Sequence, residues 1–465
     1  MNASSLRLLQ DILPADALLA SPAECLAYGY DNSRRHAMPE AVALVTTEQQ
    51  VIDIVRLCYA HNIALTARGR GTGTTGATVP THGGIVMSFE RMNKILRIDI
   101  DNRVMVVQPG VTNQQVQEAA AQHGFFWAPD PTSAAYCTVG GNLAYNSAGP
   151  RAVKYGSCRE NTLGLRAVTG EGDVIKCGVY TTKGVVGYDL TRLIIGSEGT
   201  LAIITEATLK LLPKAETKRT FMAVYSSMDA AARAVSHIMA QAITPCALEF
   251  MDENAINMVR EYAATNTHTH LPQQAAALLM IEIDGSRAHI DADVINVDAA
   301  ARVAGHIATQ HASTQQEVDA LWQTRKALSP CLRKIAPKKI NEDIVVPVSR
   351  MAELINGLNH LSTQHSIPIV NFGHAGNGNI HVNLLVNPDD LQAMHSAEQC
   401  LEAVFDLVIS LNGTLSGEHG VGIEKRDFIY KELSANEIKI MRAIKQQFDP
   451  HNILNADKTL PLQQQ

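Results

Sequence analysis

Short apolar runs of four or five residues are separated by amphipathic stretches in the first quarter of the chain. Such runs are typical of strands buried on both faces, and they lie at residues 41–45, 63–67, 84–88 and 104–108. The stretch from Thr47 to about His61 has helical spacing instead, and Thr47 with Gln50 resembles a capping box. This pattern predicts a first region of mixed strands and helices.

The pattern changes after a polar linker at residues 213–219. We expect strands at residues 221–225, 247–251 and 276–283, and helices at about residues 228–241 and 294–310. Strands that alternate with helices predict a smaller α/β layer. Further helices are expected at about residues 317–333, 351–365, 391–411 and 435–448.

Composition narrows the class of protein. The chain has 465 residues, of which 46% are hydrophobic and 18% charged, with a net charge of -7 and no basic block, so nucleic acid is not an expected partner. No run approaches the ~18 apolar residues of a membrane span, and no signal-peptide pattern begins the sequence. The eight cysteines include no Cys-x-x-Cys, which argues against an iron–sulfur centre. We expect a cytoplasmic protein, with peripheral contact to a membrane left open.

A glycine-rich loop runs from Arg68 to Gly76, directly after an expected strand. Its glycines would let main-chain amides converge on an anion, although no Gly-Lys-Ser/Thr closes it as in a Walker A loop. Turns of small residues follow at 129–133, 138–142 and 146–149, where a flat ring and a diphosphate could approach the backbone. Flexible surface loops are the alternative interpretation.

Two glycine-bracketed motifs carry three histidines and a carboxylate. Residues 373–383 contain His374 and His381, and residues 416–422 contain Glu418 and His419. Imidazole and carboxylate together suit zinc or another divalent metal. We expect His381 on a strand and His374 in the loop before it. The alternative is a pair of glycine-rich turns with incidental histidines.

Four motifs occur in order along the chain. They are Arg68-Gly69-x-Gly71-Thr72-Gly73, Gly140-Gly141-Asn142 with Asn146 and Gly149, Gly196-Ser197-Glu198-Gly199-Thr200-Leu201, and the two histidine motifs. From about residue 38 to 458 the sequence resembles the flavin-linked oxidoreductases of the vanillyl-alcohol-oxidase type. Within them it resembles the D-2-hydroxy-acid dehydrogenase branch, which includes D-lactate dehydrogenase, D-2-hydroxyglutarate dehydrogenase and the flavin subunit of glycolate oxidase.

The resemblance implies an α+β fold: a two-lobed PCMH-type FAD-binding domain, an α/β substrate cap domain and a C-terminal helical segment. The expected boundaries are residues 1–37 for a helical lead-in, 38–215 for the FAD domain, 216–420 for the cap and 421–465 for a C-terminal segment that returns to the FAD domain.

The resemblance also implies the residues that hold FAD. These are Arg68, Gly69, Arg70, Gly71, Thr72, Gly73, Pro131, Thr132, Ser133, Gly140, Gly141, Asn142, Ser147, Gly149, Glu198 and Ile204. Some relatives attach FAD through a histidine in the pyrophosphate loop. No histidine lies between Arg68 and Pro80, so we expect non-covalent FAD.

Carried over by position, the resemblance makes His374, His381 and Glu418 the metal ligands and His419 the catalytic base. The metal would be zinc, with manganese or iron as alternatives. The implied substrate-binding residues are Arg325, Ser329, Lys339 and Asn383. A planar guanidinium suits a carboxylate through a bidentate pair.

The expected reaction is the oxidation of a D-2-hydroxy acid to the 2-oxo acid, with D-lactate favoured. D-2-hydroxyglutarate, or glycolate within a complex, is the alternative substrate. A non-redox relative, alkyl-dihydroxyacetone-phosphate synthase, ranks lower because its motif is richer in consecutive histidines, whereas Val382 follows His381 here. The electron acceptor would be a quinone, a cytochrome, an electron-transfer flavoprotein or a partner subunit. A homodimer is one expected assembly.

Overall fold

The computed structural model describes residues 3–262 and 271–462. The chain divides into two compact units. The first comprises Met1–Gly149, Gly156–Lys214 and Glu418–Gln465, and the second comprises Pro150–Tyr155 and Ala215–Gly417. The chain therefore leaves the first unit twice and returns to it each time.

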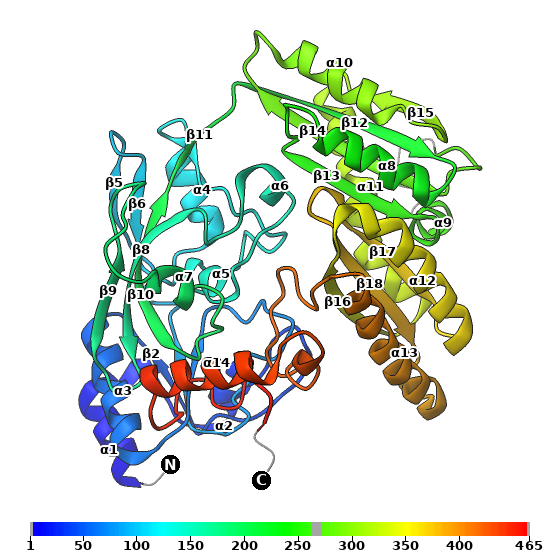
Figure 1. Ribbon diagram of the computed structural model, residues 1–465. Helices are drawn as coiled ribbons and strands as arrows, with labels where there is room; N and C mark the ends of the chain where they lie inside the picture. The colour runs from blue at the N-terminus through cyan, green and yellow to red at the C-terminus, as the bar shows by residue number, and fades with distance from the viewer. Residues whose placement is uncertain (1–2, 263–270, 463–465) are drawn as a thin grey trace. The chain divides into compact units, whose positions relative to one another are not determined.

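The first unit begins with a four-stranded sheet in the order β1-β2-β4-β3 (Figure 1). Its core strands β2 (Ala41–Leu44), β4 (Ile85–Ser88) and β3 (Leu65–Arg68) are parallel, while the short β1 (Leu18–Leu19) pairs antiparallel. Helices α1 (Ala3–Ile12), α2 (Pro22–Cys25) and α3 (Glu48–His61) belong to this lobe. The capping box predicted for Thr47 and Gln50 is confirmed at the start of α3.

The second sheet of this unit has five antiparallel strands in the order β5-β6-β10-β8-β9. They are β5 (Ile95–Asp99), β6 (Val104–Val107), β8 (Thr162–Thr169), β9 (Val174–Gly178) and β10 (Ala202–Lys210). Helices α4 (Asn113–Ala121), α5 (Val139–Tyr145) and α7 (Leu190–Ile194) accompany it, with a small pair formed by β7 (Phe125–Phe126) and β11 (Leu212–Pro213). Trp127 is fully buried in the core of this lobe.

The prediction of turns at residues 138–142 was wrong, because α5 covers most of them. Thr138 caps the helix by accepting a hydrogen bond from the amide of Gly141 at 3.3 Å. Asn146 ends it in the left-handed region, at a φ of 54°. Gly140 is required because a Cβ there would lie 2.7 Å from Pro109. Small residues that suggested turns therefore serve close packing of a short helix.

The final segment includes α14 (Ala435–Phe448) and belongs to the first unit, where residues after the helix pair with β3. Leu65 of β3 donates its amide to the carbonyl of Ile453 at 2.8 Å and accepts from the amide of Asn455 at 2.9 Å. The chain end thus adds a parallel bridge beside the strand that carries the glycine-rich loop.

The second unit is built on a seven-stranded antiparallel sheet in the order β15-β12-β14-β13-β17-β18-β16 (Figure 1). The strands are β12 (Thr217–Tyr225), β13 (Ala247–Asp252), β14 (Ala277–Gly285), β15 (His306–His311), β16 (Lys338–Val345), β17 (Ile369–His374) and β18 (Asn379–Val386). The short α6 (Ala152–Tyr155) belongs to this unit, where Lys154 bonds the carboxylate of Asp284 at 2.5 Å.

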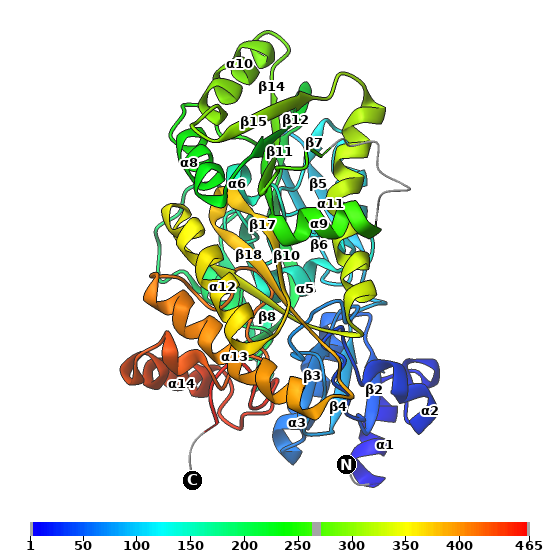
Figure 2. The same cartoon turned by 90° about the vertical axis from the view of Figure 1, so that its right-hand side faces the viewer.

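Helices cover both faces of this sheet. One face carries α9 (Glu253–Tyr262) and α11 (Gln315–Ile335), which pack on residues such as Met251 and Phe372. Figure 2 shows α8 (Met228–Met239), α10 (Ile290–Ala301), α12 (Met351–His365) and α13 (Leu391–Ser410) on the opposite side.

The prediction of a helix at residues 294–310 was wrong in its second half. The helix ends at Ala301, and Gly305, at a φ of 97°, leads into β15.

Candidate active site

A cleft in the first unit is lined by residues of the glycine-rich loop, α5 and β10. Together with the solvent at its mouth, its empty volume is about 610 Å³. The predicted cofactor residues on its walls are Arg68, Gly69, Gly140, Gly141, Glu198 and Ile204. Most other wall residues are apolar, among them Ala67, Phe89, Pro109, Ala202 and Ile203, which the sequence did not single out. Apolar walls with a few polar groups are typical of cofactor sites.

Glycines shape this cleft by letting the backbone approach its neighbours. A Cβ on Gly69 would lie 2.4 Å from the hydroxyl of Thr138, and one on Gly73 would lie 2.6 Å from that of Tyr145. Gly71 has a φ of 65° and packs against the guanidinium of Arg68. The loop is thus a cradle that side chains would fill, which fits a bound pyrophosphate.

The arginines of the loop bond protein groups. Arg68 donates from Nη1 to the carbonyl of Tyr30 at 2.8 Å and lies over the ring of Tyr28. Burial lowers the pKa of the Arg68 guanidinium. Arg70 is more exposed and lies 3.8 Å from Glu90. The guanidinium of Arg68 therefore fastens the N-terminal segment beneath the loop.

The remaining predicted cofactor residues are not on the walls of the cleft. They are Arg70, Gly71, Thr72 and Gly73 of the glycine-rich loop, Asn142 of α5, and Pro131, Thr132, Ser133, Ser147 and Gly149 of neighbouring loops. Ser147 donates its amide to the carbonyl of Asn142 at 2.8 Å, which closes the turn after α5. Their contact with a cofactor stays a prediction.

Polar wall residues outside the predicted cofactor set include Thr138, Tyr145 and Asn455. Thr138 stands directly before the Gly140-Gly141 motif, so the capping signal was readable. Asn455 is distant in sequence, and the pairing of its segment with β3 brings it here, where its Nδ2 donates to the carbonyl of Glu198 at 2.6 Å. Lys458 is nearby and donates to the carbonyl of Ala77 at 2.7 Å; burial lowers its pKa to about 7.

In the second unit, one face of the sheet gathers histidines and carboxylates. His374 is the last residue of β17 and therefore lies on a strand, contrary to the loop that we expected. Its Nδ1 lies 2.5 Å from Oε1 of Glu249, the residue opposite it on β13. Oε2 of Glu249 accepts from Nε of Arg325 at 2.9 Å. His374 and His381 meet edge to face, with ring centroids 5.3 Å apart.

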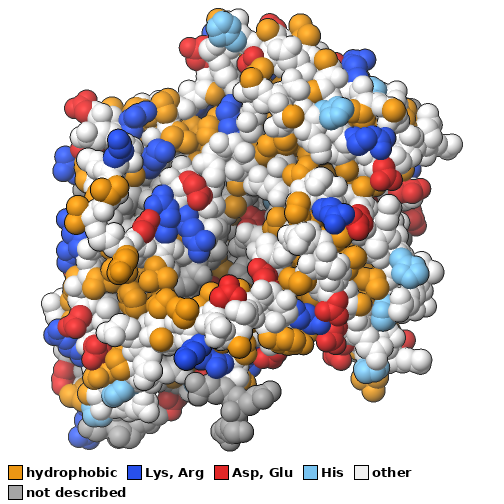
Figure 3. All heavy atoms as spheres, viewed as in Figure 1, with side chains coloured by type: hydrophobic (Ala, Val, Ile, Leu, Met, Phe, Trp, Pro, Cys, Tyr) orange, Lys and Arg blue, Asp and Glu red, His pale blue; other side chains and the backbone are white. Residues whose placement is uncertain are grey.

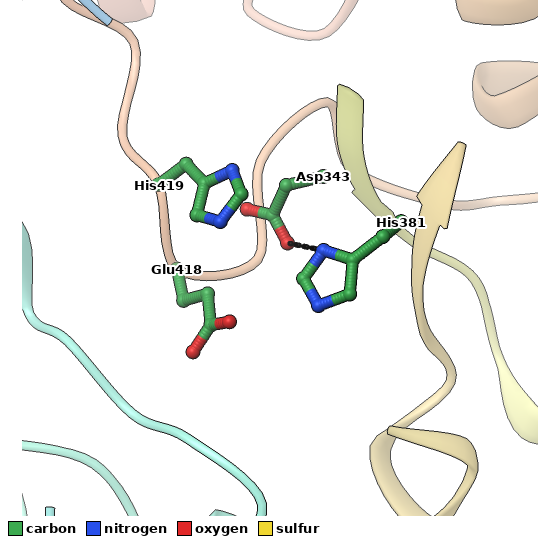
Figure 4. A group of neighbouring side chains, drawn as sticks. All are labelled: Asp343, His381, Glu418 and His419. Atoms are coloured by element: carbon green, nitrogen blue, oxygen red, sulfur yellow. Dashed lines mark ion pairs between the residues drawn. The ribbon is translucent and has the colours of Figure 1, made fainter. Parts of the chain in front are cut away.

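Asp343, His381, Glu418 and His419 have ligand atoms that all lie within 4.8 Å of one another. Figure 4 shows these four side chains. Asp343 was missed by the sequence interpretation. It lies opposite His381 in the β16–β18 register, and its Oδ1 is 3.9 Å from Nδ1 of His381. No motif marks Asp343, because only strand pairing brings it to the histidine.

The partners of Asp343 hold it in place. It is fully buried and accepts hydrogen bonds from Nδ2 of Asn379 at 2.6 Å and from the amide of Gly417 at 2.9 Å. Gly417 directly precedes Glu418, whose Oε2 accepts from the amide of Gly149 at 2.9 Å. This donor set of imidazoles and carboxylates fits a divalent metal such as zinc.

The four predicted substrate-binding residues differ in how deeply they are buried and in what they contact. Arg325 is largely buried, with its guanidinium 4.7 Å above the ring of Phe372. Asn383 is fully buried; its Nδ2 donates to the carbonyls of Val370 and His381, and its Oδ1 accepts from Asn341. Lys339 is half-buried on the same face of β16 as Asp343, and Ser329 is exposed on α11. Substrate contacts by these residues stay predictions.

Comparisons with known proteins agree on the family. The family described as "FAD linked oxidases, C-terminal domain" matches residues 214–459, and "FAD binding domain" matches residues 39–178. Glycolate oxidase subunit GlcD of Bacillus subtilis (strain 168) is 40% identical over 93% of this chain and 92% of its own length. D-lactate dehydrogenase of Archaeoglobus fulgidus is 34% identical over 93% and 95%. D-2-hydroxyglutarate dehydrogenase of Xanthomonas citri pv. viticola is 30% identical over 97% and 95%.

Solved structures share the fold at lower identity. An alkyldihydroxyacetonephosphate synthase has a TM-score of 0.77 at 19% identity, covering 98% of this chain and 86% of its own. A p-cresol methylhydroxylase also has a TM-score of 0.77, at 17% identity, covering 97% and 95%. The predicted α+β class with a PCMH-type FAD-binding fold is confirmed. Together with the matched families, this shows that the chain belongs to the FAD-linked oxidases and is an FAD-dependent oxidoreductase.

Proposed function

We propose that this protein oxidises a D-2-hydroxy acid to the 2-oxo acid, with FAD as the oxidant. The cluster of Asp343, His381, Glu418 and His419 is the observation that supports this most directly. It combines metal ligands with an imidazole able to take a proton, the two functions that dehydrogenation of an alcohol needs. The named relatives include a glycolate oxidase subunit and dehydrogenases of D-lactate and D-2-hydroxyglutarate.

Residues of the first unit would hold FAD without a covalent bond. The cradle from Gly69 to Gly73 would bind the pyrophosphate through backbone amides, and the apolar walls would enclose the ring system. No histidine occurs between Arg68 and Pro80 to form a covalent link. Release of the flavin by mild denaturation would test this assignment.

We assign the metal to His381 and Glu418 of this cluster and to His374, which is not part of it but whose ring centroid lies 5.3 Å from that of His381. His374 uses Nδ1 to bond Glu249, so Nε2 is the atom we assign to the ligand role. A carboxylate on the second nitrogen of a ligating histidine is the usual arrangement, because it orients the ring. Zinc is the preferred metal, with manganese or iron as alternatives.

When bound, FAD would accept the Cα hydride and the metal would lower the pKa of the substrate hydroxyl. His419 would take the hydroxyl proton, as an imidazole can near neutral pH. Arg325 and Lys339 would orient the substrate carboxylate. Burial raises the pKa of Glu249, but its neighbours His374 and Arg325 lower it, and the net effect holds it below its ordinary value. Glu249 thus stays ionised and keeps both partners aligned.

A panel of 2-hydroxy acids tests the proposal. The purified chain is mixed without oxygen with D-lactate, L-lactate, D-2-hydroxyglutarate or glycolate, and flavin absorbance is followed. We expect D-lactate to bleach the flavin, because we place no second basic group for a distal carboxylate, and L-lactate to leave it oxidised. Failure of D-lactate, D-2-hydroxyglutarate and glycolate alike would contradict the assignment.

A second candidate is a flavin subunit that needs partners to pass its electrons on. The relatives named glycolate oxidase subunit GlcD, from Bacillus subtilis and Escherichia coli, favour it. This chain has no cysteine cluster for an iron–sulfur relay of its own. Rapid bleaching with glycolate but no steady turnover with a soluble dye would support this candidate over a self-sufficient dehydrogenase.

A further inference from the structure

The backbone of Glu198 has an unusual conformation on the wall of the flavin cleft. Its φ is 53°, in the left-handed region that non-glycine residues seldom adopt. Its amide donates to the carbonyl of Ala144 at 2.9 Å, and its carbonyl accepts from Asn455 at 2.6 Å. The residue is therefore fixed from α5 and from the C-terminal segment, both in the first unit. Strain retained in this way often marks a functional position.

The carboxylate of Glu198 binds one short segment of backbone. Oε1 accepts from the amide of Val421 at 2.7 Å, and Oε2 accepts from the amide of Gly422 at 2.8 Å. These amides follow His419 by two and three residues. Gly420 lies between, and a Cβ there would be 2.7 Å from both Oε1 of Glu198 and Cδ1 of Tyr145. The segment after His419 is thus pressed against the wall of the cleft.

The carboxylate of Glu198 is buried, so its hydrogen bonds to these amides are needed to offset the loss of water. Glu198 is 4% exposed, and burial raises its pKa to about 7, while Lys425 and Lys458 act in the opposite direction. A buried carboxylate is costly unless its oxygens are hydrogen-bonded. Here the two side-chain bonds go to the amides of two consecutive residues, Val421 and Gly422, so the contact orders the backbone directly after His419.

We propose that Glu198, which lines the flavin cleft, is a positioning residue that fixes the backbone of His419 by holding the amides of Val421 and Gly422. This deepens the proposed function, since it rests on His419 as the base. Glu198 lines the cleft with its own backbone and holds the catalytic segment with its side chain. The flavin ring and His419, the proposed proton acceptor, would therefore both be positioned by Glu198. Such fixed placement is what near-attack geometry requires.

Hydrogen exchange of the purified protein tests the contact without using activity. In Glu198→Gln the side chain keeps one acceptor and turns an NH2 group toward the second amide. We expect peptides covering residues 417–424 to exchange about tenfold faster, because one hydrogen bond is lost. Glu171→Gln, at an exposed carboxylate of the same unit, is the matched control and should exchange as wild type. Unchanged exchange in Glu198→Gln would overturn the proposal.

A second variant approaches the same contact from the other side. Gly420→Ala introduces a Cβ against Oε1 of Glu198 at a φ of 84°. It should accelerate exchange of the same peptides while the flavin stays bound. If Glu198→Gln does not fold, this variant decides the question, and slow exchange in it would refute the proposal.

A double-mutant cycle with His419→Ala separates positioning from cofactor binding. Glu198→Gln alone should lower kcat about 10- to 100-fold with little change in KM, as a small misplacement of a catalytic group does. In the His419→Ala background the same change should have almost no further effect, because it acts through His419. Equal losses in both backgrounds, or loss of flavin absorbance, would overturn the proposal. If no 2-hydroxy acid is oxidised by the wild type, the proposed function fails while the exchange result still stands.

Discussion

At the scale of single residues, two buried carboxylates stand behind two histidines. Glu249 bonds Nδ1 of His374, and Asp343 lies 3.9 Å from Nδ1 of His381. They come from β13 and β16, the strands on either side of the β17–β18 pair. Each carboxylate can select the ring orientation that presents the other nitrogen to a metal. The motif at residues 373–383 contains the histidines, and the neighbouring strands of the sheet carry the carboxylates that orient them.

Replacement of Asp343 by asparagine should weaken the metal site. The variant keeps the shape of the side chain but loses the negative charge beside His381, so we expect metal affinity to fall about 10- to 100-fold. Metal content after equilibration with a competing chelator measures this. Asp319→Asn, at an exposed carboxylate of α11, is the control. Equal metal retention in both variants would count against an orienting role for Asp343.

At the scale of elements, the first turn of α3 connects the two sheets of the first unit. Glu48 accepts from Nη2 of Arg166 on β8 at 2.6 Å and from the hydroxyl of Thr205 on β10 at 2.7 Å. The hydrogen bond from Arg166 holds the pKa of Glu48 below its ordinary value of 4.5. The contact joins an element of the parallel sheet to the antiparallel one, across a sequence separation of more than one hundred residues.

Glu48→Gln should lower the stability of the first unit by about 1 kcal/mol at pH 7, because a charge-assisted pair is lost at a partly exposed site. A lowered pKa means that the ionised form stabilises the fold. This contribution is present above pH 4.5 and is lost as the pH falls below it. Calorimetry at several pH values should therefore show variant and wild type converging in acid. A difference in melting temperature that stays constant down to low pH would show that the charge of Glu48 does not cause the stability difference. Glu118→Gln serves as the control.

At the scale of the whole molecule, charged and apolar side chains are mixed on the surface, and the residues proposed for the chemistry come from both units. On the face in Figure 3, basic, acidic and apolar side chains are interspersed, in keeping with a net charge of -7. Within residues 3–262 and 271–462, no helix is long and apolar enough to cross a membrane. The flavin cleft belongs to the first unit, and the strands of His374 and His381 belong to the second.

Removal of metal should therefore leave the flavin in place. None of Asp343, His381, Glu418 and His419 lines the cleft, so dialysis against a chelator should not change flavin absorbance. Turnover with the best hydroxy acid should fall at least about tenfold and return when zinc or manganese is added. Turnover that is insensitive to the chelator, or flavin lost together with the metal, would refute this division.

Local signals in the sequence predicted much of this. The capping box at Thr47, the buried strands 41–45 and 84–88 and the strand carrying His381 are each encoded within a few residues, so periodicity was enough. Local patterns failed where packing decides the conformation. The small residues before Tyr145 suggested turns, yet Thr138 and the close approach to Pro109 stabilise a helix.

By itself, the sequence determined the family and the FAD cofactor and predicted the histidine set, because ordered motifs with glycines and imidazoles are visible without contacts. Only the tertiary structure decided the partners of these groups. Glu249 and Asp343 come to their histidines through strand register, and Glu198 comes to the segment after His419 across more than two hundred residues. Register and long-range hydrogen bonds depend on the packing of whole sheets, which no short stretch of sequence encodes.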